Sequence, residues 1–316
     1  MNTLTIRPSS FRGKVFIYTA LLLLTVNLPA LTSGEKLETV IVQFEMSAGI
    51  VRSREAYALA MEEAMVAAMD GGRADLVIFP EYIGVFSALI PWYDILASGK
   101  PFEEVWFAVS RETGLQSIKD LFISRAADND AFLNSLWGDL ARRYNVYILS
   151  GTRFNTEGNR LYNQAVVYSP DGEVFYRQNK YFLTDFETDI VGLNSGDIDE
   201  TDGFDIKDHH INLTICRDTF LKEWEIIHHE GDLWIDIKAN GVEYTEDQEA
   251  LFTRALPARL IKTDVPYGIT ACLTGDFLDL LWEGESSIIY NDKGKVRYIE
   301  TSDEDDSFEI MRETFP

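Results

Sequence analysis

The sequence predicts an α/β fold in which helices cover a mixed β-sheet. Apolar runs of strand length alternate with segments of helical periodicity, and tight turns join two further strand pairs. Strands that alternate with helical crossovers form parallel pairs, whereas tight turns join antiparallel neighbours. The chain has 316 residues, of which 46% are hydrophobic and 25% charged, and this length and composition suffice for a large buried core.

The first half of the predicted domain has the order strand, helix, strand. A β-branched run at 40–44 indicates a strand, and apolar residues at helical spacing over 57–69 indicate a helix. The continuous apolar run at 76–79 is typical of a strand that is covered on both faces. The next elements are a helical excursion rich in aromatic and charged residues, a helix and a strand, over 87–128, 130–144 and 146–149 respectively.

The second half begins with a hairpin, in which strands at 161–169 and 174–176 flank the turn Pro170-Asp171-Gly172. Strands and helices then alternate over 211–215, 218–229, 233–237, 248–263 and 267–272. A second hairpin turns at 291–294. The acidic run 303–306 predicts a solvated tail at 301–316, so the domain is expected to span 35–300.

The first 34 residues are expected to lie outside the fold. Arg7, Arg12 and Lys14 precede an apolar run from Val15 to Val26, and no acidic residue occurs before position 35. This pattern predicts a secretory signal peptide, since the run is shorter than the ~20 residues of a membrane-spanning helix. We therefore expect an exported protein, periplasmic or secreted. An uncleaved N-terminal anchor is the alternative, and only that form would contact a membrane.

The charge and the cysteine count exclude several classes of protein. Asp and Glu number 52 against 28 Lys and Arg, which gives a net charge of −24 and disfavours nucleic acid as a partner. Two cysteines are too few for a disulfide-dense scaffold. The pairs His209-His210 and His228-His229 suggest no metal site, because adjacent side chains on a strand or helix point in different directions.

Three strand runs are each followed closely by a reactive side chain. Glu81 follows the run at 76–79, Lys180 follows the hairpin, and Cys216 ends the run at 211–215. Strand ends in open α/β sheets converge on a crevice where ligands bind. A carboxylate, an ammonium and a thiol placed together there make a nucleophilic site. Taken singly, each has a plainer interpretation: a helix-start carboxylate, a surface lysine, and a buried or disulfide-bonded cysteine.

These segments resemble the signature regions of the nitrilase superfamily, the carbon–nitrogen hydrolases. Phe79-Pro80-Glu81 is similar to the glutamate motif of that family. The segment 161–180 is similar to its hairpin that leads into a lysine, and 213–218 (Leu-Thr-Ile-Cys-Arg-Asp) to its cysteine motif. The similar segments follow the family order and span Thr39 to Tyr298.

The resemblance implies an αββα sandwich, usually dimerising, with a Glu–Lys–Cys triad. Carried over residue by residue, Cys216 is the nucleophile, Glu81 the general base and Lys180 the cation that stabilises an oxyanion. Glu187 falls where family members often have a second, supporting glutamate. The backbone N–H of Arg217 would complete the oxyanion hole. No metal or organic cofactor is implied, and a homo-oligomer is expected.

Two departures from the family pattern concern the substrate. Arg217-Asp218 follows the nucleophile where nitrile hydrolases tend to carry Trp-Glu, which favours a small-molecule amide over a nitrile. More residues also separate Glu81 from Lys180 in the sequence than we expect for the family, and the additional residues are assigned to the 87–128 excursion. That excursion is a candidate lid or pocket wall. Its aromatic residues include Trp92, Tyr93, Phe102, Trp106 and Phe107.

The sequence thus predicts a hydrolase that cleaves a non-peptide C–N bond through a cysteine thioester and releases ammonia or an amine. Two alternatives stay open. One is a non-catalytic exported binding protein, in its simplest form with Cys216 and Cys272 joined as a disulfide. The other is an acyltransferase that passes the acyl group to an amine.

Overall fold

The structure is a computed structural model that describes residues 34–277 and 280–316. The expected signal peptide or anchor falls on 1–33 and so lies outside the described residues. Residues 34–316 form one unit. Among the residues described, we find no helix with the length and apolar character needed to span a membrane.

The thirteen described strands form one hydrogen-bonded sheet that strand β1 divides into two halves. The N-terminal part of β1 pairs with β2 and β13, and its last residues pair with β9. The first half contains β1 (Leu37–Met46), β2 (Leu76–Phe79), β3 (Tyr147–Glu157), β4 (Arg160–Tyr168), β5 (Val174–Asn179) and β13 (Glu309–Phe315). The second half contains β6 (Phe204–Ile206), β7 (His209–Ile215), β8 (Leu233–Lys238), β9 (Tyr267–Phe277), β10 (Leu280–Trp282), β11 (Ser287–Asn291) and β12 (Val296–Thr301).

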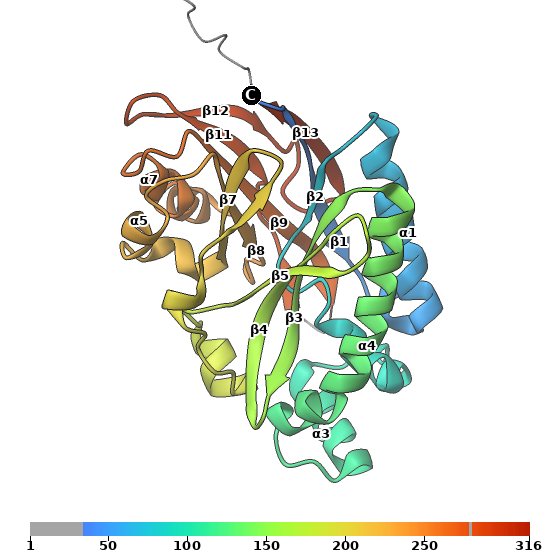
Figure 1. Ribbon diagram of the computed structural model, residues 1–316. Coiled ribbons are helices and arrows are strands. Elements are labelled where there is room, and N and C mark those ends of the chain that lie inside the picture. The colour runs from blue at the N-terminus through green and yellow to red at the C-terminus, as the bar shows by residue number, and fades with distance from the viewer. Residues whose placement is uncertain (1–33, 278–279) are drawn as a thin grey trace, which may run out of the picture. The chain divides into compact units, whose positions relative to one another are not determined.

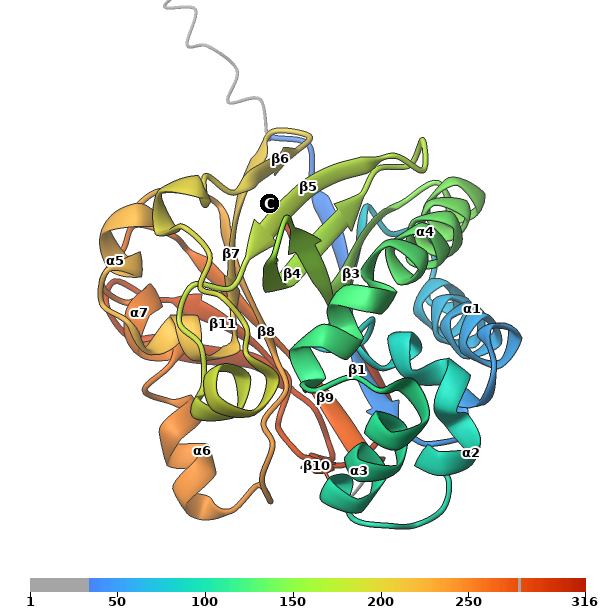
Figure 2. The ribbon, with the colours of Figure 1, turned by 90° about the horizontal axis from the view of Figure 1, so that it is seen from below.

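The two halves pack face to face between two layers of helices (Figures 1 and 2). One core fills the space between the halves, with residues from β1, β2, β7, β8 and β9. A second core lies between the first half and the helices α1 and α4, and a third lies between the second half and α5 and α7. The αββα sandwich that the resemblance implied is confirmed.

Side-chain alternation along the strands explains these layers. In β2, Leu76 and Ile78 face the core between the halves, whereas Val77 and Phe79 face the helices. All four are fully buried, as the continuous apolar run predicted. Successive side chains of a strand point to opposite faces, so a central strand of a four-layer fold is apolar on both.

The helices differ from the predicted ones mainly after residue 86. They are α1 (Arg54–Asp70), α2 (Tyr93–Leu96), α3 (Phe102–Thr113), α4 (Ile118–Tyr144), α5 (Trp224–Ile227), α6 (Glu246–Phe252) and α7 (Leu256–Leu260). The excursion is helical as predicted, but its last part belongs to α4, whose N-cap is Ser117. The single helix expected over 248–263 is two helices separated by residues 253–255, and Pro257 lies in the first turn of α7, where a missing N–H breaks no helical hydrogen bond.

The predicted solvated tail at 301–316 is wrong. Residues Glu309–Phe315 form β13, which pairs antiparallel with β1 over Leu37–Gln43. Met311 and Phe315 are buried in the core between the sheet halves. The acidic composition of the preceding loop concealed this strand, in which Met311 and Phe315 share one face and Ile310 packs against the helix-side core on the other.

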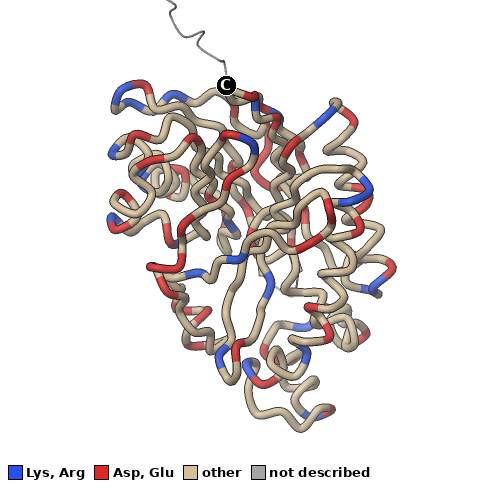
Figure 3. Tube along the Cα trace, viewed as in Figure 1, with Lys and Arg blue, Asp and Glu red and all other residues tan. Residues whose placement is uncertain are grey.

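Acidic residues occur in many helices, loops and strands along the described chain (Figure 3).

Candidate active site

The three predicted residues come together at the carboxyl ends of three strands. Glu81 lies two residues beyond β2, Lys180 directly follows β5, and Cys216 directly follows β7. All three line one cavity. Strands from both sheet halves contribute, so the site depends on the face-to-face packing of the sandwich.

A tight turn after β2 positions Glu81. Gly151 of β3 has a φ of 65°, and a Cβ there would meet the carbonyl oxygen of Pro80 at 1.8 Å. Only glycine allows this approach of the two backbones. Tyr82 also has a positive φ, of 66°, and its N–H donates to Thr152 Oγ1 at 2.8 Å. The turn is thus held against β3 on both sides of Glu81.

Lys180 lies between two buried carboxylates. Its Nζ is 2.8 Å from Glu81 Oε1 and 2.9 Å from Glu187 Oε2, and the three side chains are at most 1% exposed. Glu187, which the resemblance placed in a supporting role, is in direct contact with the lysine. The Nζ is also 3.0 Å from Glu187 Oε1, so three carboxylate oxygens surround an ammonium that has three N–H donors.

Further donors fix the two carboxylates. The Nδ2 of Asn163 on β4 lies 2.8 Å from Glu81 Oε1 and 2.9 Å from Glu187 Oε1. The N–H of Ala239 donates to Glu81 Oε2 at 3.0 Å. The hydroxyl of Tyr82 donates to Glu187 Oε1 at 2.9 Å. Every carboxylate oxygen named here accepts at least one hydrogen bond, as buried charges require.

The environment separates the pKa values of the two glutamates. Burial raises the pKa of Glu81; Lys180 opposes this, and the charge of Glu187 adds to it. Burial also acts to raise the pKa of Glu187, but Lys180 and the backbone N–H of Thr184 outweigh it and hold the pKa below its usual value. Burial acts to lower the pKa of Lys180, but the neighbouring anions raise it. Lys180 is therefore a permanent cation, and Glu81 is the carboxylate better suited to exchange protons.

Cys216 has a left-handed backbone, with a φ of 53°. Its N–H donates to Asp236 Oδ1 at 3.1 Å, and the Nζ of Lys238 donates to its carbonyl oxygen at 3.2 Å. Burial raises the pKa of the Cys216 thiol to about 12; Glu81 also raises it, whereas Lys180 and Lys238 lower it. The thiol is thus protonated at neutral pH, and its reaction needs a base.

Cys216 and Cys272 are both free thiols. The structure therefore does not contain the Cys216–Cys272 disulfide of the binding-protein alternative.

The two residues after Cys216 connect its loop to the segment after Lys180. The guanidinium of Arg217 donates to the carbonyl of Leu183 at 3.1 Å and stacks over the ring of Phe182 at 4.6 Å. Asp218 is fully buried and accepts the Phe182 N–H at 2.6 Å. Burial raises the pKa of Asp218 to about 7. Arg217 and Asp218 therefore connect the segment after β7 to the segment after β5.

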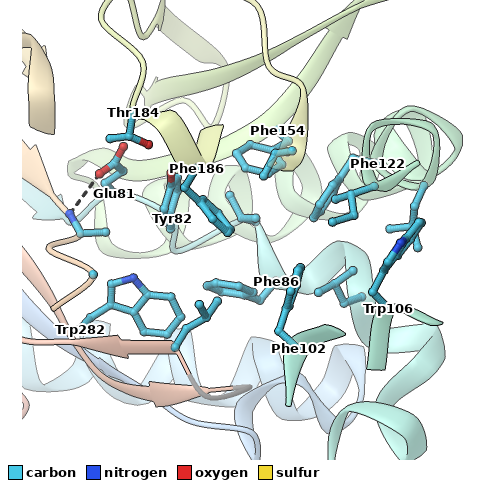
Figure 4. Close-up of a pocket in the computed structure, with 18 of the residues that line it drawn as sticks. Glu81, Tyr82, Phe86, Phe102, Trp106, Phe122, Phe154, Thr184, Phe186 and Trp282 are labelled. Carbon is cyan, nitrogen blue, oxygen red and sulfur yellow. Dashed lines mark hydrogen bonds between the residues drawn. The ribbon is translucent and has the colours of Figure 1, made fainter. Parts of the chain in front are cut away.

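The cavity has a volume of about 320 Å³ and runs from the triad residues into an apolar interior. Glu81 and Thr184 lie at one end, and Trp106 and Phe122 lie at the other (Figure 4). Of the five aromatic residues singled out in the excursion, Phe102 and Trp106 line the cavity. The other three do not: Trp92 and Tyr93 pack against the core, and Phe107 is 62% exposed.

Sequence reasoning missed several residues of the site. Asn163 lies within the hairpin motif but gave no sign of bridging two carboxylates. Asp236 and Lys238 are polar residues at alternate positions of an apolar strand, and this unusual pattern was the available signal. Phe86 and Trp282 line the cavity from segments far apart in the sequence, where no local pattern could have indicated them.

Comparison with known proteins identifies the family. The carbon–nitrogen hydrolase family model matches residues 41–227. A probable hydrolase of Bacillus subtilis (strain 168), YhcX, is 28% identical over 178 residues, which cover 56% of this chain and 29% of the relative. The chain thus spans less than a third of the length of that relative.

Solved structures with the same fold include an amidase and a second carbon–nitrogen hydrolase. A double mutant of the amidase from Nesterenkonia sp. AN1, in complex with acrylamide, superposes with a TM-score of 0.64, 14% identity, and coverage of 90% of this chain and 92% of the other. A carbon–nitrogen hydrolase from Helicobacter pylori G27 superposes with a TM-score of 0.63, 15% identity and coverage of 89% of both chains. At these identities the likeness shows the fold.

The chain belongs to the carbon–nitrogen hydrolase family. This membership favours a hydrolase of the nitrilase superfamily over the non-catalytic binding protein.

Proposed function

We propose that this hydrolase cleaves carboxylic amides through a thioester on Cys216. The observation that carries the proposal is the cluster itself: Cys216 shares a cavity with a carboxylate and with a lysine that two carboxylates keep charged. The amide complex of the Nesterenkonia amidase supports the substrate class. The Arg217-Asp218 sequence, in place of Trp-Glu, favours an amide over a nitrile.

In the first half-reaction the Sγ of Cys216 bonds to the amide carbon while Glu81 accepts the thiol proton. The carbonyl electron pair moves onto oxygen. We assign the stabilisation of this oxyanion to the ammonium of Lys180 and the backbone N–H of Arg217, because Lys180 lines the cavity with Cys216 and Arg217 directly follows Cys216 in the chain. When the tetrahedral adduct collapses, the C–N bond breaks, Glu81 returns the proton to nitrogen, and ammonia or an amine leaves.

In the second half-reaction water attacks the thioester carbon. Glu81 accepts a proton from the water, the same donors hold the second oxyanion, and the C–S bond breaks. The proton then returns to sulfur and the carboxylic acid leaves. Glu81 acts as base and acid in turn, which suits its raised pKa. Glu187 supports the step by holding Lys180 in place and charged.

The test is a screen of primary amides and N-carbamoyl compounds for ammonia release, with Cys216→Ala as the control. We expect release from at least one amide and none from the variant. Mass spectrometry of the quenched enzyme should show the acyl group on Cys216. Failure of every amide to release ammonia, or faster hydrolysis of a nitrile than of its matching amide, would contradict the proposal.

Transfer of the acyl group to an amine is the second candidate, because an amine could replace water in the second half-reaction. An added amine that gives more N-substituted amide than free acid would identify a transferase. We expect the free acid.

A further inference from the structure

The described wall of the cavity beyond the triad is apolar. Of the 24 described residues that line it, Glu81 and Lys180 are the only charged ones, and they are paired with each other. Thr184 contributes a hydroxyl, but that hydroxyl lies 3.1 Å from Glu187 Oε2 and is already engaged. The rest of the described wall therefore has no charged group that could pair with a charge on a substrate.

The helical excursion builds most of the far end. Ten of the lining residues come from the segment 86–122, more than from any other segment. Their rings and aliphatic chains face a common space, with Phe86 and Phe102 between Glu81 and Trp106 (Figure 4). Two further lining residues, Val242 and Phe186, are apolar and 48% and 37% exposed. An apolar group in the cavity thus meets mostly apolar surface.

Resting on the proposed function, we infer that the substrate is an amide with an uncharged, extended apolar acyl group, such as a medium-chain fatty or an arylalkyl amide. Burial of apolar surface drives such a group into the cavity. A carboxylate or ammonium on the acyl group would lose its hydration without gaining a partner, which is strongly unfavourable. This excludes free-acid substrates such as dicarboxylic monoamides and N-carbamoyl amino acids.

The acyl side of the amide is the side that fits the cavity. The acyl group stays on Cys216 between the two half-reactions, whereas the amine must leave and water must enter before the thioester breaks. A chain that fills the apolar interior during both steps also keeps the thioester in place for hydrolysis.

A chain-length series tests the inference. We expect kcat/KM to rise about fourfold for each methylene from butyramide to hexanamide, since each buried CH₂ contributes about 0.8 kcal/mol. The monoamide of adipic acid, which has the six carbons of hexanamide with a carboxylate in place of the terminal methyl, should react at least about 100-fold more slowly. Equal rates for this pair, or a preference for N-hexylacetamide over hexanamide, would overturn the inference.

Trp106→Ala probes the far end, with Phe107→Ala as a matched control. Trp106 lines the cavity, whereas its neighbour Phe107 does not and points to solvent. Trp106→Ala should change the rank order within the series and favour octanamide, because the far end becomes longer. Phe107→Ala should leave the order unchanged. A uniform loss across the series in Trp106→Ala would contradict substrate selection by this wall.

Binding to Cys216→Ala separates this inference from the proposed function. If calorimetry shows that this variant binds hexanamide more tightly than butyramide while the wild type hydrolyses neither, the cavity inference stands and the amide hydrolysis fails. If the wild type hydrolyses short amides and the variant shows no gain in affinity with chain length, the hydrolysis stands and the cavity inference fails.

Two charged residues of strand β8, Asp236 and Lys238, contact the backbone of Cys216. Asp236 and Lys238 alternate with the core residues Ile235 and Ile237, so both point to the same, outer face of the sheet. They form an ion pair at 2.7 Å and are at most 3% exposed. None of the steps proposed above uses this pair.

The pair contacts both peptide groups that flank the Cα of Cys216. Asp236 accepts the Cys216 N–H, and Lys238 donates to the Cys216 carbonyl oxygen. Thr219 Oγ1 lies 2.8 Å from that same carbonyl oxygen. Fixing both peptides fixes φ and ψ of Cys216 in the left-handed region, which is unfavourable for a residue with a Cβ and needs such support.

We propose that Asp236 and Lys238 are positioning residues for the nucleophile and for the oxyanion donor. The peptide from Cys216 to Arg217 is planar and trans, so its carbonyl and its N–H point in opposite directions. Lys238, by holding the Cys216 carbonyl on the outer side, directs the Arg217 N–H toward the cavity. This inference also rests on the proposed function.

The test is the double variant Asp236→Asn with Lys238→Met. It keeps the local charge balance and an acceptor for the Cys216 N–H, and it removes the Lys238 donor to the carbonyl. We expect kcat to fall about tenfold or more with KM changed less than threefold, because a transition-state donor is misaligned while the substrate cavity is intact.

Lys207→Met is the control, because Lys207 forms a comparable ion pair with Asp75 at 2.6 Å and neither residue lines the cavity. It should lower the melting temperature without changing kcat. A double variant with kcat within twofold of the wild type would overturn the positioning role. An equal fall of kcat in the Lys207 control would also overturn it, since the effect would then be one of stability.

Discussion

Replacing Lys180 by Met removes the shared counter-ion of two buried carboxylates. Glu81 and Glu187 both lie within hydrogen-bond distance of Lys180 Nζ, so their nearest oxygens are at most about 6 Å apart. At an effective dielectric constant of about 20, two unit charges at that separation repel by about 3 kcal/mol. Breaking a buried ion pair by removing one partner typically destabilises a protein by about 3–5 kcal/mol, so Lys180→Met should unfold at clearly lower urea concentration.

The double variant Lys180→Met with Glu187→Gln separates the stabilising role of Lys180 from its proposed catalytic role. The neutral amide that replaces the Glu187 carboxylate removes the repulsion, so urea unfolding should recover by about 3 kcal/mol. Activity should not recover, because the oxyanion still lacks the ammonium donor, whose loss typically lowers kcat about 10²–10³-fold.

Both quantities are measurable on the same samples, by urea unfolding and by ammonia release from the best amide of the screen. Recovery of kcat to within tenfold of the wild type in the double variant would refute the reasoning, because Lys180 would then only balance charge. An unchanged unfolding midpoint in Lys180→Met would refute the electrostatic part.

The remaining predictions concern the nucleophile, the base, a buried histidine and export. Cys216→Ala should abolish turnover with an unchanged melting temperature, since it removes a nucleophile and little packing; a kcat within tenfold of the wild type would exclude Cys216 as nucleophile. The acid limb of the pH profile of kcat/KM should lie above the ordinary pKa of a glutamate, because Glu81 must be ionised and its pKa is raised. A pH–rate profile checks this. An acid limb at the ordinary pKa of a glutamate would exclude Glu81 as the base. Burial between two tryptophans lowers the pKa of His228 to about 4, so between pH 4 and 6.5 the unfolded chain binds more protons than the folded one and the free energy of unfolding falls on acidification. In His228→Phe the fall in the free energy of unfolding between pH 7 and pH 5 should be smaller by about 2 kcal/mol. An equal fall in wild type and variant would contradict the lowered pKa of His228. The full chain should be exported, as the basic residues before the run Val15–Val26 predict; cell fractionation with sequencing of the mature N-terminus checks this, and a soluble cytoplasmic product beginning at Met1 would overturn it.

Local sequence patterns were sufficient where the physical cause is local. The run Leu76–Phe79 is apolar because both faces of β2 are covered, and the turn Pro170-Asp171-Gly172 joins β4 and β5 because its residues suit a tight turn. The positions of Glu81, Lys180 and Cys216 at strand ends were likewise predictable, since each follows a recognisable strand. The resemblance to a known family then placed these three side chains in one site.

Patterns failed where several weak signals compete. The acidic stretch before β13 suggested a tail, although Met311 and Phe315 complete the core beside β1. The start of α4 was placed twelve residues too late, because aromatic and charged residues in 118–129 obscured its periodicity. In both cases packing against another element outweighed the local composition.

Contacts between distant segments are the part that only the tertiary structure decided. Lys180 is held between Glu81 and Glu187, and Asp236 accepts the N–H of Cys216, because strands from two sheet halves end at one place. The sequence by itself determined which residue types could do chemistry and on which strand ends they stand. The packing of the two halves decided which of them share a low-dielectric cavity, and therefore which pKa values rise and which substrates fit.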